Sequence, residues 1–98
     1  MSIPRPEIMI PIALTLLQRL CTALTDMADQ GPRIEDRSLL VDLQACVLPE
    51  AIVSLPLTLL ERACKGYLDM AEQGARTGDI DLMEDLDKAI DRFEMRRL

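Results

Sequence analysis

The stretch Leu55–Arg76, LPLTLLERACKGYLDMAEQGAR, largely repeats the stretch Ile12–Arg33, IALTLLQRLCTALTDMADQGPR. At an offset of 43 residues, the two stretches carry the same residue at twelve of twenty-two positions. Agreement of this kind is typical of a duplicated structural unit. The two halves of the chain are therefore expected to adopt the same local structure and to bury their apolar sides against each other.

The composition favours helices. Hydrophobic residues make up 49% of the chain, but only 2% of residues are aromatic. Leu, Met and Ala favour helices, whereas the aromatic and β-branched residues that favour strands are few. We predict an all-α fold of four antiparallel helices, formed by two tandem helical hairpins. The hairpins would make either a four-helix bundle or two stacked helical repeats.

Apolar residues recur at helical spacing in both copies of the repeat. The first stripe is Ala13, Leu17, Leu20, Leu24 and Met27, and the second is Pro56, Leu60, Ala63, Tyr67 and Met70. Such a stripe is typical of a helix with one buried face. Gly31 and Gly74 follow the stripes and suit the left-handed residue that ends a helix. The predicted helices cover about residues 11–30, 36–48, 56–73 and 79–96.

The predicted domain organisation is a short arm followed by one domain. Residues 1–11 contain three prolines and should be extended. Residues 12–98 form the single helical domain, with hairpin repeat 1 at 12–48 and hairpin repeat 2 at 55–97. The predicted helix at 36–48 is apolar on nearly every side, which one small chain can hardly cover. We therefore expect a homodimer.

The charge and the cysteines restrict the class of protein. The net charge is −6, so direct nucleic-acid binding, which needs a surplus of Lys and Arg on one face, is disfavoured. No apolar run reaches the roughly 20 residues that cross a bilayer. The cysteines Cys21, Cys46 and Cys64 show no clustered spacing, which is typical of reduced thiols in the cytoplasm. We expect a cytoplasmic protein that binds neither nucleic acid nor membrane.

The residue inventory offers no catalytic equipment. The chain has no His, which removes the commonest general base and every Ser–His or Cys–His nucleophile. The four glycines form no phosphate-binding loop, and the three cysteines lack the spacing of a zinc site. We expect a non-enzymatic protein without a cofactor or a metal.

One polar motif, D-M-A-[DE]-Q-G-x-R, occurs at Asp26–Arg33 and again at Asp69–Arg76. Its acidic residues lie in the last turn of a predicted helix, where they oppose the helix dipole. Arg33 and Arg76 could fold back onto these acids or onto the terminal carbonyls as caps. Alternatively, the motif forms two related polar sites that meet a partner or an anion.

The functional hypothesis is a small adaptor, chaperone or regulator that binds a partner protein through an aliphatic helical surface. The candidate partner-binding residues are Ile8, Ile10, Ile52, Val53, Arg33 and Arg76. One alternative is an acidic inhibitor that occupies the basic, nucleic-acid-binding surface of a target protein. A second alternative is a ligand or metal carrier that uses the Cys and Met residues.

Overall fold

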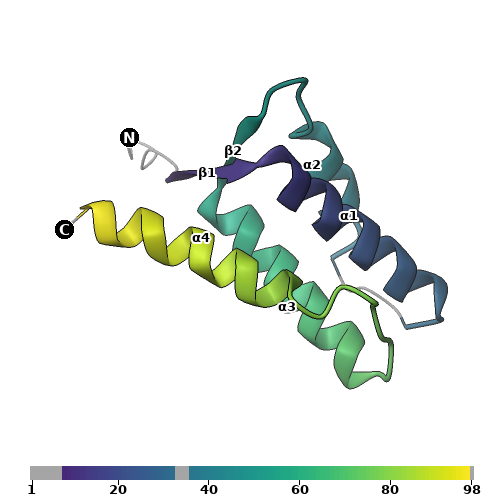
Figure 1. Cartoon of the computed structure of the whole chain (residues 1–98). Helices are drawn as coiled ribbons and strands as arrows, with labels where there is room; N and C mark the ends of the chain where they lie inside the picture. The colour runs from purple at the N-terminus through teal and green to yellow at the C-terminus, as the bar shows by residue number, and fades with distance from the viewer. Residues whose placement is uncertain (1–7, 33–35, 98) are drawn as a thin grey trace, which may run out of the picture.

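The structure, a computed structural model, describes residues 8–32 and 36–97. Its elements follow the order β1 (Met9–Ala13), α1 (Leu14–Asp29), α2 (Leu39–Ala45), β2 (Ile52–Pro56), α3 (Leu57–Glu72) and α4 (Leu82–Arg97). Each half of the chain therefore contributes one strand and two helices, in the same order (Figure 1). The fold is mostly helical with a small two-stranded sheet.

The two strands form an antiparallel ribbon that joins the two halves. Ile10 lies opposite Leu55, and Pro11 lies opposite Ser54. Pro11 and Ser54 are also equivalent in the repeat, since they are 43 residues apart. Pairing a residue with its own repeat equivalent in an antiparallel ribbon defines an approximate twofold axis through that pair. The two halves are thus related by a pseudo-twofold rotation.

The ribbon corrects the prediction of a four-helix bundle without strands. Residues 9–13 alternate between exposed and buried positions, as a strand does and a helix does not. The backbone N–H of Leu14 donates to Ala51 O at 2.9 Å, and that of Leu57 donates to Ile8 O at 2.8 Å. Hydrogen-bonded pairs recur at every second residue of an antiparallel ribbon, so Ile10–Leu55 is such a pair and Pro11–Ser54 and Met9–Pro56 are not. Pro11 and Pro56 therefore occupy positions where no backbone N–H is needed for strand pairing. Proline is therefore compatible with both strands.

Helices α1 and α3 run from the ribbon to the opposite end of the molecule (Figure 1). Both have 16 residues, and both begin directly after a strand. Gly31 (φ 112°) and Gly74 (φ 100°) follow their ends in the left-handed conformation that the sequence predicts for them. Ala13 and Pro56, which the helical stripe includes, instead belong to the strands.

The core is aliphatic and combines both halves. The inner face of the ribbon contributes Ile10, Ile12, Val53 and Leu55, and the helices contribute mainly Leu17, Leu20, Leu24, Leu39, Leu43, Leu60, Met70, Leu82 and Leu86. Within the described residues, no polar or charged side chain is buried. Gly66 brings α3 close to α2, because a Cβ added there would lie 2.8 Å from Leu39 Cδ2.

The second helices of the two halves differ in length. The first, α2, has 7 residues, whereas α4 has 16. The chain must leave α2 early because residues 46–51 return it to β2, while the second half of α4 continues beside β1. Leu39 and Leu43 are the buried residues of α2, and Val41 is exposed, so α2 is less enclosed than the sequence predicts. No helix in the described ranges is long and apolar enough to cross a membrane.

Candidate functional site

Arg19, on α1, holds two carboxylates of the second half. Its Nε and Nη2 donate to Asp79 Oδ2 and Oδ1 at 2.7 and 2.6 Å, and its Nη1 donates to Asp85 Oδ2 at 2.8 Å. The planar guanidinium is suited to this bidentate contact. The contact fixes the turn before α4 against α1.

Arg62, on α3, makes the equivalent contact in the other direction. Its Nε and Nη2 donate to Asp36 Oδ2 and Oδ1 at 2.5 and 2.7 Å, and its Nη1 donates to Asp42 Oδ2 at 2.9 Å. Each of these residues lies 43 positions from its counterpart in the contact of Arg19. We call the two contacts the reciprocal clamps. Each half supplies the arginine that the carboxylates of the other half bind.

The hydrogen bonds of the reciprocal clamps favour the charged forms of the side chains that they join. Hydrogen bonds from Arg62 and Arg19 lower the pKa of Asp36 and Asp79 below its usual range. The same hydrogen bonds raise the pKa of both arginines. Each clamp joins an arginine of one half to two carboxylates of the other, so the clamps hold the two halves together.

The repeated polar motif lies at the end of the molecule opposite the ribbon. Gln30 binds the backbone of Arg76: its Oε1 accepts the Arg76 N–H at 2.9 Å, and its Nε2 donates to the Arg76 carbonyl. In the other copy, Gln73 Nε2 donates to Asp69 O at 3.3 Å. Gln30 of the first copy thus joins the turn after α1 to the turn after α3.

The two copies of the motif meet around a shallow hollow. The hollow has a volume of about 400 Å³ and is lined by Gln30, Gly31, Pro32, Gln73, Gly74 and Ala75. The Arg76 side chain is exposed, and within the described residues it makes no ion pair with the acids of its own motif. Arg33 lies outside the described residues.

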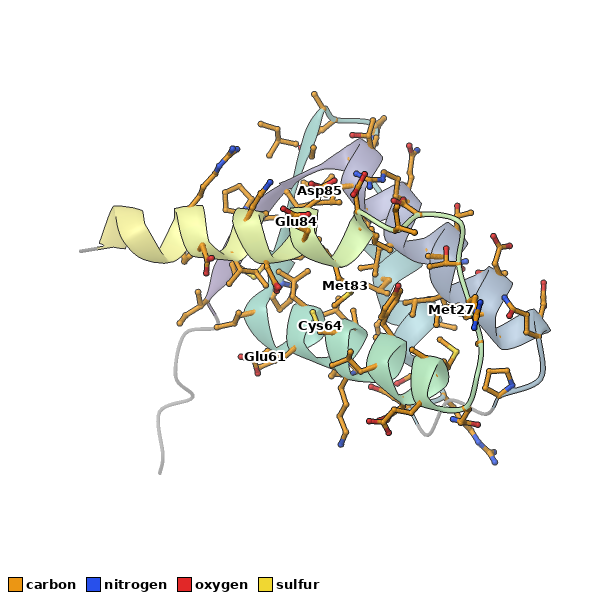
Figure 2. All side chains as sticks on the ribbon, turned by 60° about the horizontal axis from the view of Figure 1, so that its bottom comes forward. Met27, Glu61, Cys64, Met83, Glu84 and Asp85 are labelled. Atoms are coloured by element: carbon orange, nitrogen blue, oxygen red, sulfur yellow. The ribbon has the colours of Figure 1, made fainter. Side chains whose placement is uncertain are left out.

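The three cysteines are free and half-buried. Burial raises the pKa of Cys21, Cys46 and Cys64, so each is a thiol at neutral pH. Figure 2 shows Cys64 of α3 and Met83 of α4 in the space between these helices. Among the residues that the structure describes, no three His, Cys, Asp or Glu side chains are grouped to hold a metal ion.

The structure separates the apolar residues that the sequence predicts for partner binding. Ile52 is 61% exposed on the outer face of the ribbon, whereas Ile10 and Val53 are buried in the core on its inner face. Ile8 is half-buried. Because neighbouring strand residues point to opposite faces, adjacent apolar residues such as Ile52 and Val53 cannot both reach a partner there.

Exposed large apolar side chains of the described residues are most frequent in the chain segment that runs from α2 into β2. The described residues include seven large hydrophobic side chains that are exposed: Met9, Val41, Val47, Leu48, Ile52, Leu68 and Ile80. Four of the seven, Val41, Val47, Leu48 and Ile52, fall within residues 41–52, and we call them the 41–52 surface. This segment includes the loop that projects between α2 and β2 in Figure 1. The sequence indicates the surplus of apolar residues here but not which of them face outward.

The outer face of the ribbon is uncharged. Its exposed residues are Met9, Pro11, Ala13, Ile52 and Ser54. A two-stranded ribbon can enter the major groove of DNA, but readout there uses polar side chains and support from Lys or Arg. The two strands, Met9–Ala13 and Ile52–Pro56, contain neither Lys nor Arg.

Comparisons of the chain with protein-family models, with curated proteins and with solved structures found no match.

Proposed function

We propose that the protein is a small non-enzymatic interaction module, acting as an adaptor, chaperone or regulator of a partner protein. The observation that supports this function best is the 41–52 surface, where four large apolar side chains are exposed within twelve residues. Full burial of a fully exposed side chain of this size contributes about 1.5–3 kcal/mol, and these side chains are 40–65% exposed, so covering each contributes roughly half of that. These side chains could therefore supply most of the affinity for a partner.

The proposed partner presents an apolar helix or an apolar extended segment. Either one can cover a short aliphatic surface with side chains at regular spacing. Glu50, within the segment, is exposed, and the whole chain carries a net charge of −6. Basic residues at the rim of the partner's segment would therefore favour binding and help to exclude acidic competitors.

The substitution Leu48→Asp, alone or combined with Val47→Asp, is expected to weaken partner binding at least ~10-fold, because it places a charge in the proposed interface. Wild-type and variant chains would be used for affinity capture from an extract of the native cells, and the captured proteins would be quantified. We expect a partner that wild-type chain retains and that Leu48→Asp retains at least ~10-fold less, which corresponds to about 1.4 kcal/mol.

Leu68→Asp is the matched control, because Leu68 on α3 is 56% exposed and Leu48 is 48% exposed. The control chain should retain the partner as the wild type does, and circular dichroism should show the same helix content in all chains. Equal capture by Leu48→Asp and Leu68→Asp would contradict the proposed function.

An acidic inhibitor of a nucleic-acid-binding protein is the second candidate function. Its support is the end of the molecule where the polar motifs meet, since Asp26, Asp29 and Glu72 are exposed there. The two functions differ in their salt dependence. Partner retention through the 41–52 surface should persist at 1 M salt, where the Debye length is only about 3 Å, whereas retention through the acidic end should be lost.

A further inference from the structure

Four charged residues lie along α4 at helical spacing, two acidic residues first and two basic residues after them. Asp81, Asp85, Lys88 and Arg92 are separated by four, three and four residues, which places them along one side of a helix. Asp81 precedes α4 but shares its register, because the Asp81 carbonyl accepts the Asp85 N–H at 2.9 Å. We call these residues the α4 stripe. Its first half is acidic and its second half is basic.

The α4 stripe is complementary to a second copy of itself in antiparallel orientation. The midpoint between Asp81 and Arg92 is also the midpoint between Asp85 and Lys88. Two antiparallel α4 helices that meet at this midpoint therefore place Asp81 opposite Arg92 and Asp85 opposite Lys88. A twofold axis produces each pair twice, as an isologous interface requires.

The α4 stripe borders an open groove. The groove has a volume of about 500 Å³ and lies between α4, the start of α1 and the ribbon. Asp85, Lys88 and Arg92 lie along its α4 side, and Arg19 of α1 also lines it and binds Asp85. Its apolar residues are Pro11, Ile12, Ala13, Leu16, Ile52, Ala89 and Phe93. In Figure 2, Asp85 lies on the side of α4 that faces away from α3. The groove thus combines an apolar floor with a charged wall.

The charges of the stripe are only partly used within one chain. Asp85 Oδ2 already accepts from Arg19 Nη1 at 2.8 Å in one of the reciprocal clamps, so its Oδ1 is the oxygen left for Lys88 of another copy. Among the described residues, the side chains of Asp81 and Arg92 make no hydrogen bond or ion pair, and both are exposed. Lys88 pairs with Glu84 at 3.2 Å, where both side chains are more than half exposed. Such an exposed pair holds Lys88 weakly and leaves it available to a carboxylate of another chain.

We propose that the protein forms a homodimer in which α4 of each copy lies antiparallel along the groove of the other. The apolar groove supplies the affinity, because exposed ion pairs contribute at most about 1 kcal/mol each. The stripe sets the register and excludes other arrangements. A stable interface covers roughly 800 Å² of each partner, which is about 12% of the accessible surface of 6862 Å². The interface shares Ile52 with the 41–52 surface, whereas Val41, Val47 and Leu48 lie outside the groove.

Charge reversal at the two ends of the stripe tests this dimer. Asp81→Arg alone faces Arg92 of the other copy twice, and Arg92→Asp alone faces Asp81 twice. Each single variant should weaken dimerisation at least ~10-fold, because facing like charges are unfavourable. An equimolar mixture of the two variants should dimerise again, since both contacts then join opposite charges. The variant with both substitutions should also dimerise.

Sedimentation velocity measures dimerisation of the full chain, which has a monomer mass of 11.0 kDa, in the two single variants, their mixture and the double variant. Asp29→Arg and Lys65→Asp make the same charge changes at exposed sites on α1 and α3 and should leave the dimer intact. Leu48→Asp should also leave it intact, so that failure of the dimer and failure of the proposed function can be distinguished. A monomeric wild type at several hundred micromolar, unchanged dimerisation of the single variants, or a mixture that stays monomeric would overturn the proposal.

Discussion

Leu17→Ala and Leu60→Ala, made separately, are expected to destabilise the protein by about 2–5 kcal/mol each. Both side chains are fully buried, and the two residues are equivalent in the repeat. Each lies in the first turns of a long helix, next to the ribbon, so truncation leaves a cavity where the two halves meet. A domain of this size is stable by only about 5–15 kcal/mol, so the double variant should be largely unfolded at 25 °C.

Urea unfolding followed by circular dichroism measures these changes. Leu68→Ala, at an exposed position of α3, is the control and should change the free energy of unfolding by less than about 0.5 kcal/mol. A cost at Leu17 of several kcal/mol combined with none at Leu60 would mean that the two copies lie in unlike environments. That result would contradict the pseudo-twofold arrangement.

Arg19→Met and Arg62→Met are each expected to lower the thermal midpoint by several degrees at pH 7. Each substitution leaves two neighbouring carboxylates without their shared cation and removes a contact between the halves. The clamp arginines are each 36% exposed, so solvent screening limits the effect, and added salt should reduce it further. The double variant should lose more than either single variant.

The pH dependence provides a second readout of the clamps. The pKa of Asp36 and Asp79 is lower in the folded chain than the value of about 3.9 in an unfolded chain. Their contribution to stability is therefore complete above about pH 4 and is lost as the pH falls through their folded pKa values. The thermal midpoint of the wild type should fall in this acid range, and that of Arg19→Met/Arg62→Met should fall less.

Lys65→Met is the matched control for the arginine variants. It also removes one cation, but Lys65 is exposed on α3 and lies outside the clamps and the α4 stripe. Exposed charges of this kind contribute at most about 1 kcal/mol, so the thermal midpoint at pH 7 should hardly change. If Arg19→Met behaved like Lys65→Met at every pH, the clamps would not be structural.

The long helices could be predicted from the sequence, but the strands could not. The apolar stripes and the glycines Gly31 and Gly74 locate α1 and α3 because both signals are local. Each strand, by contrast, has five residues, includes a proline and forms hydrogen bonds to a strand about 43 residues away. Local preference cannot reveal such a pairing, since strand formation depends on the partner more than on intrinsic propensity.

The residues of the reciprocal clamps recur 43 positions apart in the sequence, but their spacing does not predict that they contact each other. Arg19 and Asp79 are 60 residues apart, so no helical or hairpin pattern joins them. Their repeat equivalents, Arg62 and Asp36, nevertheless carry the same charges, and charged surface residues in a repeat need not be retained. Likewise, the outward position of Ile52 and the inward position of Val53 follow only from the register of the ribbon.

Nuclear Overhauser effects between Hα protons test the ribbon most directly. Residues opposite each other at non-hydrogen-bonded positions of an antiparallel pair have their Cα atoms only about 4.5 Å apart. Strong Hα–Hα effects are therefore expected between Met9 and Pro56, between Pro11 and Ser54, and between Ala13 and Ile52. Sequential helical effects through residues 9–13 and 52–56, with no effect between Pro11 and Ser54, would contradict the pseudo-twofold fold.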